Sequence, residues 1–299
     1  MKEIIVPSDY EIRVKNEAIK YRPTIGYERL EQKLLTLIML LLKEDSNSIT
    51  LSIYDILNFF CMSPGGKSYK LVEQAIESIK SKQFKITDAQ GRTTFISWLN
   101  EAIIFKNNNT VMFVVNDAMK RYFFNIEKNY SKINWVYSMG LKYKHSQRIY
   151  EILCMNKFKR RNDEVTIQYD ELLELLGLQK YKSFYEFDKW VLSKVASEIS
   201  SSTPFTMSYR KETISTGICI VFKYHEKTPE EIEQIDSLFK DNKKIKLMLE
   251  SLRSIKDSDY SNINSEEDII SIRKNIEANG LLQLENKSAQ PIQIKKTSK

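Results

Sequence analysis

Cysteine, histidine, glycine and proline are all scarce in this chain of 299 residues, which has three cysteines, two histidines, eight glycines and six prolines. Cys61, Cys154 and Cys219 lie far apart within apolar or amphipathic stretches, which fits reduced, buried thiols better than a disulfide framework or a zinc site. With His145 and His225 as the only histidines, no Ser/His/Asp or Cys/His set can be identified. We therefore expect no metal and no cofactor.

Long apolar runs are missing as well. The stretch Leu37 to Leu42 is bounded by Thr36 and Lys43, far short of the ~20 residues that a membrane-spanning helix needs. The N-terminus is charged from Lys2 onward and lacks the apolar stretch of a secretory signal. We expect no membrane partner and a cytoplasmic location.

The remaining composition is that of an ordinary globular protein with an excess of positive charge. Hydrophobic residues make up 42% of the chain and charged residues 28%, and 46 Lys and Arg against 39 Asp and Glu give a formal net charge of +7. A basic balance favours a polyanionic partner. The length suggests two domains of roughly 100–150 residues each.

The first half of the chain follows the order helix, strand, helix, turn, helix, hairpin. Hydrophobic periodicity and turn residues predict a helix over 27–43, a strand over 48–53, and helices over 54–60 and 67–83, with a break at 63–66. Three β-rich segments, 84–86, 93–105 and 110–115, are interpreted as one β-hairpin, followed by a helix over 117–126 and a polar stretch. This order is typical of a winged helix, a helix-turn-helix with an appended β-wing.

The second half repeats this order. The predicted elements are a helix over 145–159, a strand over 165–167, helices over 169–176 and 183–200, and a hairpin formed by 205–210 and 216–224. A shift of 115 residues carries Tyr54 and Asp55 onto Tyr169 and Asp170. The common register indicates a duplicated unit.

These patterns predict a mainly helical α+β fold with two tandem winged-helix domains, a pseudo-repeat, and a helical C-terminal extension. The predicted domains are residues 1–140, 141–227 and 228–299. Thr228, Pro229 and Glu231 are typical of a helix start, with the N-cap, Pro at the first position and Glu at the third. The last residues, 285–299, are interpreted as a flexible basic tail.

Two fragments resemble catalytic motifs. Gly66-Lys67-Ser68 matches the end of a phosphate-binding loop, but Cys61 stands where the first glycine of that loop is required. His145 and Arg148 match the His-x-x-Arg fragment of tyrosine recombinases, and the first turn of a polar helix explains both residues equally well. We interpret the chain as having no active site.

The exposed faces of the two long helices are the candidate DNA-reading surfaces. On the second helix, a core stripe of Phe184, Phe187, Val191 and Val195 leaves the opposite face to polar residues. Lysine, glutamine and serine on such a face can contact base edges or phosphates in the major groove, although a solvated helix face is the alternative for each helix. The candidate DNA-binding residues are Lys67, Ser68, Lys70, Gln74, Lys157, Lys159, Arg160, Arg161, Lys180, Lys182, Ser183, Tyr185, Lys189, Ser193, Arg210 and Lys211.

The sequence resembles the replication initiators of iteron-containing plasmids over about residues 10–226. The resemblance is carried by Leu30 to Leu35, by Ser146 to Leu153, and by the second unit from Tyr181 to Pro204 with the hairpin strands that follow. Glu198-Ile199 with Thr203-Pro204 is its most specific part. A relative has an arginine run early in the second long helix, where this chain has Asp188, Lys189 and Trp190, so the resemblance does not define the base contacts.

The resemblance implies a function and partners. Initiators of this family bind directly repeated double-stranded DNA at a plasmid origin, melt or bend it, and recruit the host helicase and initiator. Their dimers form largely through the first domain and repress the protein's own gene, whereas monomers initiate replication. We therefore expect a non-enzymatic initiator that binds tandem repeats, itself and host replication proteins. The alternatives are a winged-helix transcriptional repressor without an initiator role and, remotely, a recombinase-like strand-transfer enzyme.

Overall fold

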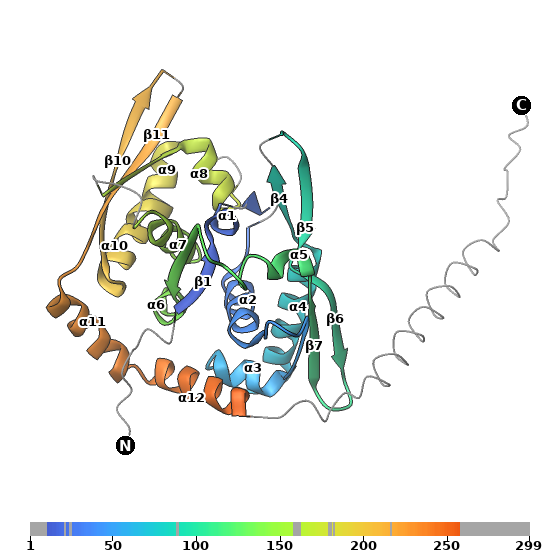
Figure 1. The fold of residues 1–299 in the computed structure, drawn as a ribbon. Helices are drawn as coiled ribbons and strands as arrows, with labels where there is room; N and C mark the ends of the chain where they lie inside the picture. Colours follow the sequence, from blue (N-terminus) through green and yellow to red (C-terminus); the bar gives the residue numbers. More distant parts are fainter. Residues whose placement is uncertain are drawn as a thin grey trace, which may run out of the picture. The chain divides into compact units, whose positions relative to one another are not determined.

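A helix-turn-helix followed by a β-hairpin occurs twice along the chain (Figure 1). The computed structural model describes residues 11–20, 22–23, 26–87, 90–157, 163–178, 181, 183–215 and 217–257. The first unit comprises α2 (Arg29–Leu41), β3 (Ser48–Ser52), α3 (Ile53–Phe59), α4 (Gly66–Ser81), β6 (Leu99–Phe105) and β7 (Thr110–Val115). Strand β7 lies between β3 and β6 in an antiparallel sheet, so the wing is tied to the strand that precedes α3.

The second unit has the same topology. It comprises α7 (Ser146–Asn156), β9 (Glu164–Gln168), α8 (Tyr169–Leu175), a long helix made of α9 (Phe184–Phe187), η2 (Asp188–Leu192) and α10 (Ser193–Ser202), and the wing strands β10 (Phe205–Ile214) and β11 (Gly217–Glu226). Strand β11 lies between β10 and β9, as β7 lies between β6 and β3. Residues related by the 115-residue shift share their environments. Leu57 and Leu172 are both fully buried, and the equivalent Val72 and Phe187 are at most 1% exposed.

The prediction of a single hairpin over 84–115 is wrong. Strand β4 (Gln83–Thr87) lies between β5 (Thr93–Ser97) and β2 (Arg22–Pro23) and pairs with both, whereas β6 and β7 belong to the sheet of the wing. The chain changes sheets at Trp98, whose indole is buried and whose carbonyl accepts a hydrogen bond from the Asn116 N–H at 2.9 Å. The first winged helix therefore carries an inserted β-hairpin between α4 and its wing.

The segment after the first wing also differs from its prediction. The helix predicted over 117–126 is only α5 (Asp117–Lys120), and Asn125 and Asn129 adopt positive φ in the segment that follows it. The stretch interpreted as polar then forms β8 (Tyr130–Asn134), which pairs with β1 (Glu11–Lys15), and α6 (Trp135–Gly140). The short helix α1 (Asn16–Ile19) follows β1.

The C-terminal extension packs on the winged-helix units. Helix α11 (Pro229–Asp241) starts with the predicted capping box, because the Thr228 hydroxyl accepts from the Glu231 N–H and the Glu231 carboxylate accepts from the Thr228 N–H. The Tyr137 hydroxyl of α6 donates to Asp236 of α11, and burial with this contact raises the pKa of Tyr137. Helix α12 (Lys243–Asp257) buries Met248 and Leu252.

The three cysteines are free thiols, with Cys154 and Cys219 buried and Cys61 half-buried.

Within the part of the chain that the structure describes, no helix combines the length and the apolar character required to cross a membrane.

His145 precedes α7 and gives a testable pH dependence. Burial, and secondarily the charge of Lys144, lower the pKa of His145 from 6.5 to about 4. Between these two pH values the unfolded chain therefore binds more protons than the folded chain, and stability falls as the pH falls, by at most about 1.4 kcal/mol per pH unit. We expect His145→Gln to remove this part of the acid sensitivity, measured as the difference between urea unfolding free energies at about pH 6.5 and about pH 4.5.

The matched control is His225→Gln, since His225 is the second histidine and is exposed on β11. A His145→Gln variant that loses as much stability on acidification as the wild type would contradict the assignment.

Candidate nucleic-acid interface

The second long helix, formed by α9, η2 and α10, presents one face to the core and one to solvent. Ser183 caps its start by accepting a hydrogen bond from the Glu186 N–H at 3.3 Å. Phe187, Val191 and Val195 are buried, as their spacing predicts, whereas Phe184 is only half-buried. Of the predicted polar face, Tyr185, Lys189 and Ser193 are exposed and lie together.

Aromatic rings lie beside the lysines of this face. Tyr185 is 69% exposed and Trp190 is 55% exposed. The Lys189 ammonium lies 5.2 Å from the centre of the Trp190 ring and 6.0 Å from that of Tyr185, and the Lys194 ammonium lies 4.6 Å from the Trp190 ring. Ring faces attract cations without neutralising them, so this surface retains its positive charge. It suits a polyanion that offers phosphates together with apolar groups in its groove, such as the thymine methyl.

Trp190 and Lys194 are absent from the sequence prediction, and the π-helical turn η2 explains the omission of Trp190. At 100° per residue, Leu192 would point about 140° away from the buried Phe187, and Trp190 would lie only about 60° from it. The wider turn of a π-helix changes this register, so that Leu192 is fully buried and Trp190 is exposed. No feature of the local sequence marks this turn.

The second wing is fixed against the helix by side chains of β10. The Tyr209 hydroxyl donates to the Asp188 carboxylate, and burial with this contact raises the pKa of Tyr209. The Lys211 ammonium lies 4.9 Å from the centre of the Phe184 ring. Lys211, a candidate from the sequence, is thus held beside the start of the helix that carries Lys189.

Arg210, on the same strand, is already bound by carboxylates. Its guanidinium forms a bidentate pair with Glu164, at 2.9 and 3.2 Å, and donates to Glu212 at 2.8 Å. These contacts raise the pKa of Arg210 and lower the pKa of Glu164. A phosphate would have to compete with both carboxylates, so Arg210 is the weakest of the described candidates.

The first long helix, α4, offers a simpler cationic face. Val72, Ala75, Ile76 and Ile79 are buried, while Lys67, Lys70 and Gln74 are exposed and Ser68 is half-buried. Among the described residues, no ion pair engages Lys67 or Lys70. Both ammonium groups are therefore available to phosphates, and the predicted orientation of this helix is confirmed.

The basic cluster before the second unit lies partly outside the described residues. Lys157, at the end of α7, forms an ion pair with Glu226. The other candidates from the sequence, Lys159, Arg160, Arg161, Lys180 and Lys182, lie outside the described residues. Contact with DNA stays a prediction for every candidate residue.

Comparison with known families identifies the chain. A family model described as the winged helix 1 of an initiator replication protein matches residues 11–154, and one described as the winged helix 2 of an initiator Rep protein matches residues 168–222. Together they match more than half of the chain. The protein belongs to the initiator replication (Rep) protein family. The predicted tandem winged helices of this Rep protein are thereby confirmed.

A solved structure agrees on the fold. The crystal structure of the Pi initiator protein in complex with iteron DNA matches with a TM-score of 0.57 at 12% identity, covering 75% of this Rep protein and 99% of the Pi chain. Domains 2 and 3 of RctB match with a TM-score of 0.38 at 14% identity, covering 65% and 81% of the respective chains. A comparison with curated protein sequences found no significant match.

Proposed function

We propose that this Rep protein initiates plasmid replication by binding directly repeated double-stranded DNA at the origin, with α4 and the second long helix in successive major grooves. The observation that carries the proposal is the presence of both Rep winged helices in one chain. The exposed lysines of both long helices supply the positive charge that phosphate binding needs. The Pi initiator, which shares the fold, was crystallised with iteron DNA, and iterons are the repeats that we propose for this protein.

The proposal extends to partners and regulation. We infer that the protein acts in the cytoplasm and without enzymatic activity, that it dimerises largely through the first winged helix, and that the dimer represses its own gene. Monomers in balance with this dimer would initiate replication and recruit the host helicase and initiator. The family membership supports these inferences, and the free cysteine thiols fit a reducing compartment.

A footprint on origin DNA tests the two-helix binding mode. Recognition helices one turn apart read sites 10–10.5 bp apart, so one monomer should protect roughly 20 bp. Replacing Lys67 and Lys70 with alanine should weaken protection of one half of that footprint and leave the other half occupied. Lys80→Ala is the control, since Lys80 is exposed in the last turn of α4. Protection of a single turn by the wild type would contradict the proposal.

Replication itself separates an initiator from a plain repressor. A plasmid that carries only the origin repeats should replicate when the protein is supplied in trans, and should be lost when Lys67, Lys70 and Lys189 are replaced together. A protein that binds the repeats and represses its promoter, yet never supports such a plasmid, would be a transcriptional repressor on the same fold.

A further inference from the structure

The second recognition helix is attached to the linker that precedes α7. Glu198, in the second half of α10, is 8% exposed. Its carboxylate accepts hydrogen bonds from two consecutive backbone N–H groups, those of Lys142 and Tyr143, the latter at 3.0 Å. Such a buried carboxylate satisfied by two backbone donors holds the helix against one point of the main chain. Residues 142–145 are called the bridge segment below.

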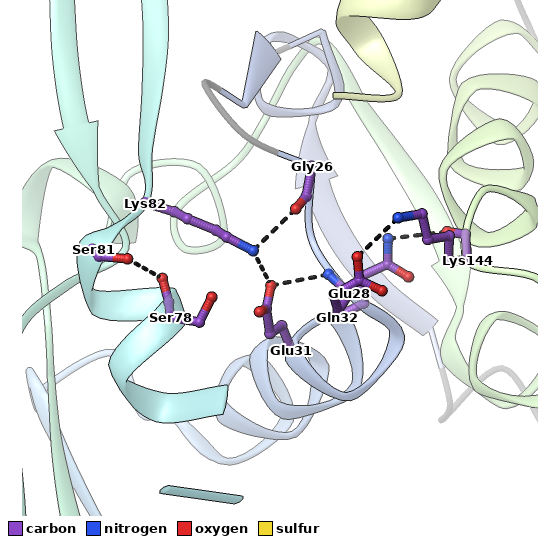
Figure 2. Close-up of polar contacts among 8 residues, drawn as sticks. All are labelled: Gly26, Glu28, Glu31, Gln32, Ser78, Ser81, Lys82 and Lys144. Carbon is purple, nitrogen blue, oxygen red and sulfur yellow. Dashed lines mark hydrogen bonds and ion pairs between the residues drawn. The ribbon is translucent and has the colours of Figure 1, made fainter. Parts of the chain in front are cut away.

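The other side of the bridge segment is attached to α2, in the first winged helix. The Lys144 ammonium pairs with Glu28 at 2.8 Å, and the Gln32 side-chain amide donates to the Lys144 carbonyl oxygen at 3.1 Å (Figure 2). Glu28 and Gln32 lie at and just after the start of α2. The bridge segment therefore has α10 bonded to one part of it and α2 to another.

The start of α2 is attached in turn to the first recognition helix. The Lys82 ammonium, at the C-terminal end of α4, contacts the Glu31 carboxylate and donates to the Gly26 carbonyl oxygen at 3.0 Å (Figure 2). Glu31 also accepts from the Glu28 N–H at 2.9 Å. A chain of polar contacts thus runs from the end of α4 to α10, with its Lys82–Glu31 end buried and its Lys144–Glu28 link exposed.

Gly26 is a second point at which the two winged helices meet. A Cβ atom added to Gly26 would lie 2.8 Å from the Gly177 carbonyl oxygen and 3.1 Å from that of Leu176, at the end of α8. The first distance is shorter than real Cβ atoms show, and the second is tighter than nine in ten real Cβ contacts. The main chains of the two units approach so closely here that only glycine fits without a shift.

We propose that these contacts hold the two recognition helices at a fixed separation, so that the Rep protein selects the number of base pairs between the two halves of its site. The inference rests on the proposed function. Glu198 and Gly26 act as positioning residues that set the spacing between the two half-sites. Neither residue lies on the exposed faces that carry Lys67, Lys70 and Lys189, because Glu198 is buried against the bridge segment and the Gly26 main chain is packed against the end of α8. They would affect spacing without contacting a base.

The geometry of DNA makes this selection measurable. One inserted base pair moves the second half-site by about 3.4 Å along the duplex and turns it by about 34° around the axis. Two winged helices joined in a fixed arrangement cannot follow such a change without breaking contacts with one half-site, whereas loosely joined units follow it at little cost. Affinity as a function of spacing therefore reports how firmly the two units are held.

The test compares purified full-length variants on duplexes whose half-sites are moved apart or together by one or two base pairs. In Glu198→Gln, an amide NH₂ replaces one of the two accepting oxygens and faces a backbone donor. Glu233→Gln, at an exposed position of α11, removes the same charge and is the matched control. We expect wild type and control to lose at least about tenfold in affinity with two inserted base pairs, and Glu198→Gln to lose about threefold or less.

A second variant, Gly26→Ala, acts at the other contact and keeps the test decisive if Glu198→Gln fails to fold. Its methyl group displaces the backbone of Gly177, so the preferred spacing should shift or the preference should weaken. Thermal melts confirm that each variant is folded. Folded variants with the wild-type spacing profile, or a wild type indifferent to spacing, would overturn the inference. A wild type that binds no origin repeats would instead overturn the proposed function.

Discussion

Replacing Lys82 with methionine is expected to lower the free energy of unfolding by about 3–5 kcal/mol, because it leaves a buried charge without its partner. Lys82 is 6% exposed and Glu31 is 5% exposed. The Lys82 ammonium also lies 5.0 Å from the centre of the Tyr27 ring, so that a carbonyl, a carboxylate and an aromatic face surround it. Without the cation, the Glu31 carboxylate keeps the Glu28 N–H and loses its counter-charge.

The double variant Lys82→Met/Glu31→Leu distinguishes the loss of a charge pair from the loss of packing. Replacing both partners of a buried ion pair with apolar residues is often neutral, so the double variant should regain most of the stability lost by the single one. Lys80→Met, at an exposed site two residues away, should stay within about 0.5 kcal/mol of the wild type. Urea unfolding measures all three variants. A Lys82→Met variant as stable as Lys80→Met would show that water, and not the Lys82 ammonium, stabilises the Glu31 carboxylate.

The tandem winged helices could be predicted because their signals are local and repeated. Apolar residues at helical spacing define α2, α4 and α10, and the capping box at Thr228 defines the start of α11. Both signals depend on residues within a few positions of one another. Duplication adds a check, since the two units place equivalent residues such as Leu57 and Leu172 in the core.

Features that depend on distant partners could not be predicted. The apolar run over 93–105 looks like one strand, but it changes sheets at Trp98: β5 belongs to the sheet that contains β2, and β6 belongs to the sheet that contains β3, both far away in sequence. In the same way, the engagement of Arg210 by Glu164 joins residues 46 positions apart. The contact of Glu198 with Lys142 joins residues 56 positions apart. Residue type and spacing carry no information about such pairs.

The lysines of the candidate surface could be predicted, because the sequence shows which face of a helix is exposed. Lys67, Lys70 and Lys189 are exposed because the opposite faces of their helices are apolar, and that pattern is visible in the sequence. Trp190 was not predictable, because one π-helical turn rotates it out of the core and no residue nearby signals the turn. The aromatic part of the surface thus depends on a backbone irregularity, of a kind that occurs frequently at functional sites.

Phe187→Ala is expected to destabilise the second winged helix by about 3–5 kcal/mol, because it removes a large aromatic side chain from the core. Phe187 is 0% exposed. Its ring meets those of Tyr169 and Tyr181 edge-on, with both pairs of ring centres 5.4 Å apart. The cavity left by alanine would therefore lie between α8 and the start of the second recognition helix.

Lys189→Ala, two residues further along, is the matched variant that should affect binding and not stability. The Lys189 side chain is exposed and, among the described residues, its ammonium lies near the exposed rings of Tyr185 and Trp190, so its loss should change stability by about 0.5 kcal/mol or less. A base contact typically contributes about 1–3 kcal/mol of discrimination, whereas a phosphate contact strengthens specific and non-specific binding alike. We expect Lys189→Ala to lower the ratio of affinities for a repeat-containing duplex and a scrambled one. Thermal melts and binding titrations of both variants measure the effects on stability and on binding separately. An unchanged affinity ratio for Lys189→Ala would show that Lys189 contacts phosphates alone or makes no contact with DNA.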